Sequence, residues 1–226
     1  RGVKRSIALG ALAVLAGLGV LAAGLWAAGY DPALALGALW HGAFGSWQVV
    51  ASATLVRATP LILLGLAFAL ALRGGALNIG AEGQFYAGAT AAAWIGLHVA
   101  GWTPVLAIGA TWVAALVAGA LWMVVPVVLR LRFGVLEVIS TLLLNFVAES
   151  FVSLMVQGPL QERTHVYPQS DPIAVAARLP VIPGTRLHLG FGVAIVLAAG
   201  LWYVLARTAW GFRLIATGLG PRAALV

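Results

Sequence analysis

The chain has 226 residues, of which 62% are hydrophobic and 8% are charged, and its mean hydropathy is +1.04. About a quarter of the residues of a soluble domain are charged, so this composition excludes an ordinary soluble globular protein. The net charge of +7 comes from basic residues that stand singly or in small groups at the ends of apolar runs. This distribution favours the positive-inside pattern of a membrane protein over nucleic-acid binding.

The residue types that the chain lacks exclude several kinds of functional site. The chain contains no cysteine, which excludes disulfides, thiolate metal sites and cysteine nucleophiles. Lysine occurs only at Lys4, whereas a Walker A loop needs a lysine after a glycine-rich turn. None of His41, His98, His165 and His188 has a metal-ligand neighbour three or four residues after it. We therefore expect no metal site, no bound cofactor and no nucleotide-binding site in this chain.

The first membrane helix is predicted at residues 6–30, an uncharged run preceded by Arg1, Lys4 and Arg5. The apolar part of a signal peptide has only about 7–15 residues. Roughly 20 apolar residues span a bilayer, so this run is long enough to cross as a retained helix. Its basic start indicates that it enters from the cytoplasm.

The next segment is predicted to be irregular. Residues 31–57 mix tryptophan, histidine and glutamine with glycines, which favours an external segment at the membrane interface. Pro60 then opens an apolar run that ends at Arg73. That run is short for a straight span, so we expect a broken helix or re-entrant region over residues 60–84.

Residues 74–84 are the most informative stretch of the chain. They read Gly-Gly-Ala-Leu-Asn-Ile-Gly-Ala-Glu-Gly-Gln and place Asn78, Glu82 and Gln84 among four glycines. A carboxylate and amides are costly at membrane depth, and dense glycines break a helix. Irregular backbone survives there only where it is buried in protein or lines a cavity. This stretch is therefore a candidate functional interior.

The rest of the chain predicts four further crossings. Apolar runs place helices near residues 84–100, 105–129, 138–157 and 187–206. Residues 158–186, with five prolines and charges of both signs, are predicted to form an external loop. The expected fold is thus an all-α polytopic membrane protein with about six transmembrane helices.

The positions of the basic residues favour a cytoplasmic N-terminus. In that orientation only Arg57, Arg163, Arg178 and Arg186 are external. The cytoplasmic set is Arg1, Lys4, Arg5, Arg73, Arg130, Arg132, Arg207, Arg213 and Arg222. The opposite orientation would reverse this bias.

A second set of polar residues recurs at every fourth position along the predicted helix 138–157. The set is Glu137, Thr141, Asn145, Glu149 and Ser153, which lie along one face of a helix. Exposing a central acid to lipid costs about 2.5–3.5 kcal/mol, so this face is expected to point into protein or a water-filled path. Polar side chains that bridge helices contribute about 0.6 kcal/mol each. Bridging and a path remain equal alternatives for Asn145, and a path or gating role is favoured for Glu149.

Three segments resemble one family. Residues 59–62 (Thr-Pro-Leu-Ile) with 77–84 (Leu-Asn-Ile-Gly-Ala-Glu-Gly-Gln) resemble the permease subunits of bacterial ABC importers of the nucleoside and simple-sugar class. Residues 137–145 (Glu-Val-Ile-Ser-Thr-Leu-Leu-Leu-Asn) resemble a second signature of that family. Residues 208–224 resemble a third, the cytoplasmic segment with the coupling helix, although Leu219 and Gly220 depart from its usual pattern.

The resemblance implies a multi-pass permease domain over residues 1–226 in the bacterial inner membrane, translocating nucleosides or related small polar solutes. Its implied partners are a second permease subunit, an extracytoplasmic solute-binding protein and a separate ATP-binding cassette ATPase that hydrolyses ATP with Mg²⁺. Such permeases continue through more helices, so the domain is expected to be incomplete at its C-terminus. The cytoplasmic segment is expected at residues 207–226, where the ATPase-coupling residues implied are Gly218, Gly220, Pro221, Arg222, Ala223 and Ala224.

The substrate path is a hypothesis drawn from the polar residues. Amides and carboxylates suit ribose hydroxyls and base edges, and the candidates are Asn78, Glu82, Gln84, Asn145 and Glu149. The alternative is a proton-coupled secondary transporter in which Glu82 and Glu149 carry protons within discontinuous helices. A purely structural scaffold is a third alternative, but it would not explain why acids that are costly within the membrane are present.

Overall fold

The structure is a computed structural model that describes residues 2–220. Over that range it contains helices and no strand, apart from an isolated bridge between Val181 and His188. The chain divides into two compact units. The first comprises the residues up to Arg57 together with Pro183–Leu187, and the second comprises Ala58–Ile182 and the residues from His188 onward.

The first unit begins with α1 (Gly2–Ala27), which is apolar on all sides, and its side chains from Ser6 onward are mostly exposed. A helix of this kind faces lipid or other protein rather than water. The next helix, α2 (Pro32–Phe44), starts at Asp31, whose carboxylate accepts hydrogen bonds from the backbone N–H groups of Ala33 and Leu34. Short helical turns follow as α3 (Trp47–Val49) and η1 (Val50–Leu55), the latter π-helical.

The structure corrects two predictions in this region. Helical backbone runs from Trp47 through α4 (Val56–Arg73), a stretch long and apolar enough to cross a membrane. Arg57 therefore lies inside a helical span rather than in an external segment, and Pro60 lies inside α4 rather than opening it. Proline removes one helical hydrogen bond, and the π-helical turn upstream shows the backbone adjusting without ending the helix.

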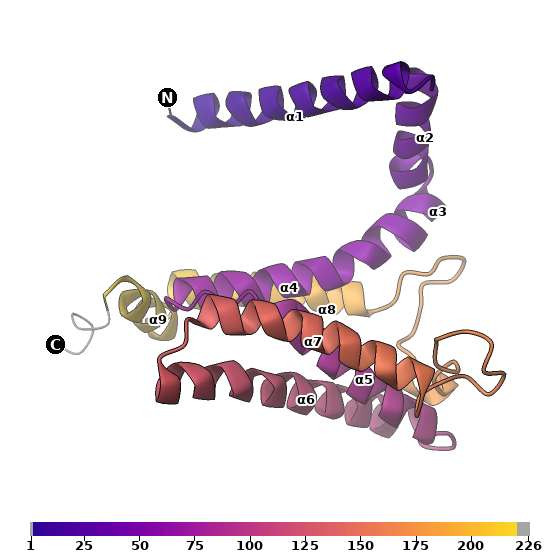
Figure 1. The fold of residues 1–226 in the computed structure, drawn as a ribbon, viewed down its shortest axis with the longest axis vertical. Helices are drawn as coiled ribbons and strands as arrows, with labels where there is room; N and C mark the ends of the chain where they lie inside the picture. Colours follow the sequence, from indigo (N-terminus) through magenta and orange to yellow (C-terminus); the bar gives the residue numbers. More distant parts are fainter. Residues whose placement is uncertain (1, 221–226) are drawn as a thin grey trace. The chain divides into compact units, whose positions relative to one another are not determined.

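The second unit is built around α5 (Figure 1). Its remaining helices are α5 (Ala81–His98), α6 (Pro104–Phe133), α7 (Glu137–Gln157), η2 (Val175–Ala177), α8 (Gly190–Arg207) and α9 (Ala209–Leu219). α5 packs against both α6 and α7, and α9 packs against α8. A Cβ on Gly88 of α5 would lie 2.9 Å from the carbonyl oxygen of Ala115, so glycine allows the two backbones to approach. Small residues at helix interfaces are the usual means of such packing in membranes.

Five helical segments of residues 2–220 are long and apolar enough to span a membrane: Ser6–Ala27, Trp47–Arg73, Pro104–Phe133, Glu137–Gln157 and Gly190–Arg207. The prediction of an all-α polytopic membrane protein is confirmed. α5 is the sixth long helix, and it is not among the five segments. Its first turns carry Glu82 and Gln84, and it is flanked by α6 and α7.

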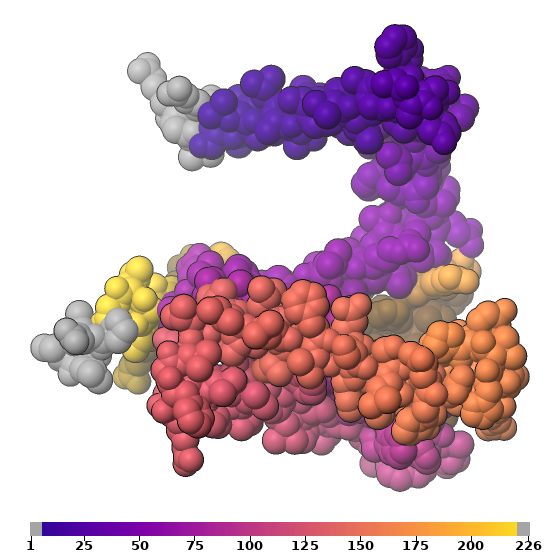
Figure 2. All heavy atoms as spheres, viewed as in Figure 1, coloured from indigo at the N-terminus to yellow at the C-terminus, as the bar shows by residue number. Residues whose placement is uncertain are grey.

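The second unit has two distinct ends. The part of the long loop that belongs to this unit, residues 158–182, stands at one end and α9 at the other, as the orange and yellow regions of Figure 2 show. Residues 74–80, which join α4 to α5, are non-helical and are called the break. Irregular backbone was predicted among these glycines, and the structure shows it there.

Candidate functional site

The break is held by side-chain amides. Gly75 has φ +78°, a left-handed conformation that favours glycine. The Asn78 Oδ1 atom accepts a hydrogen bond from the Gly80 N–H at 2.8 Å, and its Nδ2 donates to Gln84 Oε1 at 3.0 Å. Gln84 Nε2 donates in turn to the Gly119 carbonyl of α6 at 3.2 Å. These two amides therefore fasten the break to the start of α5 and to α6.

Asn145 of α7 completes this network. Its Oδ1 accepts from the Gly83 N–H at 2.8 Å, and its Nδ2 donates to the Ile79 carbonyl at 3.0 Å. The first N–H groups of a helix lack partners within the helix, so Asn145 supplies one for α5. A Cβ on Gly83 would lie 3.0 Å from Asn145 Oδ1, so a larger residue there would crowd the contact. Asn145 therefore bridges α7 to the start of α5 and to the break.

Glu137 fixes the break from the other side. Its Oε1 accepts from the Leu77 N–H at 2.8 Å, and its Oε2 forms an ion pair with Arg130 of α6. The sequence placed Glu137 on the polar face of α7 but not in the candidate site. Its position just before an apolar run and shortly after Arg130 is the signal that could have revealed this role.

The two acids of the predicted path lie apart from this network. Glu82 is exposed on the first turn of α5 and accepts a hydrogen bond from the Tyr86 hydroxyl at 3.2 Å. Glu149 is exposed on α7. The structure thus divides the predicted path residues into a bonded set, Asn78, Gln84 and Asn145, and an exposed set, Glu82 and Glu149. Tyr86 is half-buried and bonded to Glu82, and it was missed, although it lies one helical turn after Glu82.

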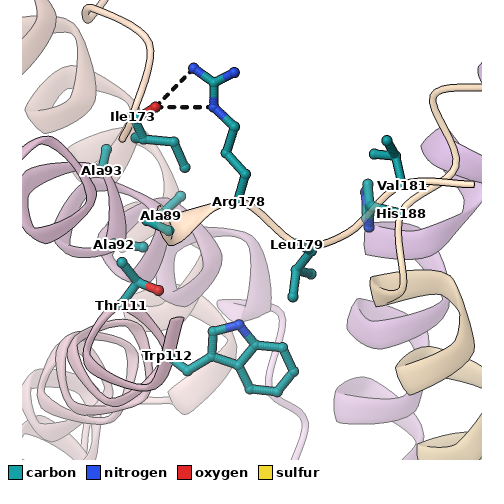
Figure 3. A pocket seen from close by; sticks show the side chains of 11 residues that line it. Ala89, Ala92, Ala93, Thr111, Trp112, Ile173, Arg178, Leu179, Val181 and His188 are labelled. Carbon is teal, nitrogen blue, oxygen red and sulfur yellow. Dashed lines mark hydrogen bonds between the residues drawn. The ribbon is translucent and has the colours of Figure 1, made fainter. Parts of the chain in front are cut away.

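A cavity of about 540 Å³ lies nearer the long loop (Figure 3). One wall is formed by Ala89, Ala92 and Ala93 of α5 with Thr111 and Trp112 of α6, and the other includes Val181 and His188. Residues 173–181, here called the strap, run between the two walls. The Arg178 Nε and Nη2 atoms donate to the Ile173 carbonyl at 3.0 and 2.9 Å.

A smaller cavity of about 150 Å³ adjoins the same face of α5. Ala89 and Ala93 line both cavities, and Tyr86 lines the smaller one. The two cavities therefore adjoin each other at these alanines of α5, and the smaller one is lined by the residue whose phenol is bonded to Glu82. Neither cavity resembles a metal site, and no three histidine or acidic side chains of residues 2–220 come together as metal ligands.

α9 lies against the break. It starts at Thr208, whose hydroxyl accepts from the Gly211 N–H at 3.2 Å, and it exposes Trp210 and Phe212. Gly218, one of the predicted coupling residues, lies within α9, which ends at Leu219. Its backbone packs on residues 73–75, where a side chain would not fit. Gly220 is the first residue after the helix, and the predicted coupling residues Pro221, Arg222, Ala223 and Ala224 lie outside the described residues.

Comparisons with known proteins agree on one family. Residues 50–226 match the model of the permease component of branched-chain amino acid transport systems. A glucose ABC transporter permease of Haloferax volcanii is 38% identical over 94% of this chain and 58% of its own length. A guanosine ABC transporter permease of Bacillus subtilis is 34% identical over 94% of this chain and 61% of its own length. A nucleoside ABC transporter permease of Lactococcus lactis is 28% identical over 97% of this chain and 62% of its own length. The chain thus spans about three fifths of the length of these relatives. No solved structure matches it.

Proposed function

The chain belongs to the family of permease components of branched-chain amino acid transport systems, and from this premise we propose that it is a membrane-spanning subunit of an ATP-driven importer of nucleosides or related small polar solutes. Relatives named for guanosine, nucleosides and glucose support this solute range. The chain itself is a transport subunit, and ATP with Mg²⁺ is hydrolysed on a separate ATP-binding cassette subunit. An extracytoplasmic binding protein delivers the solute, and a second permease subunit completes the path.

The proposed orientation places the N-terminus, the break and α9 at the cytoplasmic side of the plasma membrane. The charges support it, because Arg73, Arg130 and Arg132 lie at helix ends beside the break. The long loop of residues 158–189 is then external, where the binding protein docks.

The observation that carries the proposal is the contact between α9 and the break. Gly218 packs on the backbone of residues 73–75, and the break is bonded through Asn78, Gln84 and Glu137 to α5, α6 and α7. Movement of α9 therefore reaches the packing of three membrane helices. The exposed apolar side chains of Trp210 and Phe212 give α9 a surface on which a soluble ATPase can dock.

The solute path is proposed along the exposed set, Glu82 and Glu149, and the half-buried Tyr86. Their polar atoms are available to a solute, because they are not committed to backbone groups of the break. Asn78, Gln84 and Asn145 shape the path by holding the break.

Uptake into proteoliposomes that contain the complete importer tests this function. We expect nucleoside uptake that requires the binding protein and ATP and that stops when the ATPase is inactivated by substitution. The exposed acids favour one rival, a proton-coupled transporter. Uptake that continues with the ATPase inactive and a proton gradient present would support that rival.

A further inference from the structure

The cavity beneath the strap has no role in the function described so far. We propose that it is an outer solute subsite that takes an uncharged, flat heteroaromatic ring, such as the base of a nucleoside, on the indole of Trp112. The inference rests on the proposed function as an importer of nucleosides or related solutes, and it adds to that function a binding site.

The size and shape of the cavity fit such a solute. Its volume of about 540 Å³ is within the usual range for small-molecule sites. The alanines of α5 leave the space open, and the Trp112 ring is 43% exposed beneath the strap (Figure 3). Nucleic-acid bases stack on aromatic side chains of this kind irrespective of their sequence.

The one charged side chain that lines the cavity points away from Trp112. Of the described lining residues, Arg178 alone carries a formal charge, and its Nε and Nη2 atoms are directed to the Ile173 carbonyl (Figure 3). His188 Nδ1 accepts a hydrogen bond from the Gly190 N–H at 3.2 Å. A phosphate attached to a base on Trp112 would therefore have no cationic group directed at it, whereas a nucleoside carries no such charge.

The polar groups of the cavity are too few for a hexose. The Thr111 hydroxyl is already donated to the Ile108 carbonyl at 2.8 Å, and His188 offers one ring N–H. A sugar has hydroxyl groups around its whole ring and would lose hydrogen bonds to water on entering. A nucleoside stacks its base on Trp112 and can leave its ribose toward the opening.

The cavity lies next to the residues proposed for the solute path. Ala89 and Ala93 line both this cavity and the smaller one, which is also lined by Tyr86, the partner of Glu82. The proposed subsite therefore adjoins the proposed path on the same helix, α5.

Photo-crosslinking tests the subsite in the assembled complex with an azido-substituted guanosine, and it requires no transport. We expect labelling near Trp112 that is competed by guanosine but not by GMP or glucose. Trp112→Ala should raise the concentration of azido-guanosine that gives half-maximal labelling about ten-fold. Trp112→Phe should raise it much less, because an aromatic ring remains. Trp202→Ala, which changes an exposed tryptophan of α8 that does not line this cavity, is the matched control.

A second variant keeps the test independent of the fold around Trp112. Ala92→Leu fills the cavity and should prevent labelling, whereas Ala91→Leu, which faces a different hollow, should not.

Labelling that is unchanged in Trp112→Ala and Ala92→Leu, or that a phospholipid displaces and guanosine does not, overturns the subsite. ATP-driven uptake of glucose alone would overturn the solute class while leaving the importer intact. Absence of ATP-driven uptake for every solute would contradict the proposed function instead.

Discussion

Gly218 of α9 packs directly on Gly75 of the break. A Cβ added to Gly75 would lie 2.9 Å from the Gly218 Cα, and one added to Gly218 would lie 2.8 Å from the Gly75 N. The two backbones approach so closely that both positions require glycine, although they are distant in sequence. α9 therefore contacts the membrane bundle at the break, the segment between α4 and α5.

A methyl group at this junction should impair transport. We expect Gly218→Ala to lower the ATP-driven uptake rate at least about ten-fold, because backbone atoms of residues 73–75 must move to admit the Cβ. Gly200→Ala in α8 is the matched control, since no atom lies within 4 Å of the added Cβ. Uptake by Gly218→Ala at the rate of the control would show that α9 and the break are not coupled.

Removal of the Asn145 amide should destabilise the protein. Asn145→Ala leaves the Gly83 N–H and the Ile79 carbonyl without their partner, and an unpaired buried polar group costs about 1–3 kcal/mol. We expect a lower temperature of unfolding in detergent for this variant. Ser150→Ala, which removes only a hydrogen bond to Phe146 within α7, should change it little. Equal unfolding temperatures for the two variants would contradict the bridging role.

Substitution of the exposed acids, Glu82 and Glu149, should lower transport without lowering stability. Glu82→Gln and Glu149→Gln keep the side-chain size and remove the charge, and neither carboxylate holds the break. We expect nearly unchanged unfolding temperatures but uptake lowered about ten-fold, measured in proteoliposomes with the complete importer. Full uptake in both variants would remove these residues from the solute path.

The folded long loop should become less stable at low pH, because Glu162 becomes protonated. The hydrogen bond from Gln169 Nε2, with further ones from the Thr164 hydroxyl and the Tyr167 N–H, lowers the pKa of the Glu162 carboxyl below its ordinary value. A lowered pKa in the folded loop gives stability above the ordinary pKa, and this stability is lost as pH falls through the lowered value.

Amide hydrogen exchange at Tyr167, corrected for the intrinsic effect of pH, measures this between about pH 6 and about pH 3. We expect exchange to become faster toward the lower pH in the unsubstituted protein. Glu162→Gln should remove this dependence, because the amide does not titrate. The same profile in both proteins would exclude Glu162 as the titrating group.

Much of the fold follows from local composition. The apolar run before Gln157 and the charged and polar residues at its ends predict α7 almost to its observed bounds. The glycines at positions 74, 75 and 80 predict irregular backbone, which the structure shows. Pro60 was expected to open the apolar run of its helix, but it lies within α4, and Gly218 lies within α9, although both residues are disfavoured in an isolated helix. Packing of a helix against its neighbours overrides such propensities.

The sequence by itself determined that the chain is a bundle of membrane helices with acids and amides near a glycine-rich break. These properties depend on runs of neighbouring residues and on the solvation cost of each side chain. Only the tertiary structure decided which polar groups are already bonded. Asn145 lies 62 residues from Gly83 and 66 from Ile79, and Glu82 has its partner within one turn of α5. A hydrogen bond between distant segments depends on how the helices pack, so the division between residues that hold the break and residues that remain open to a solute is decided only when the chain is folded.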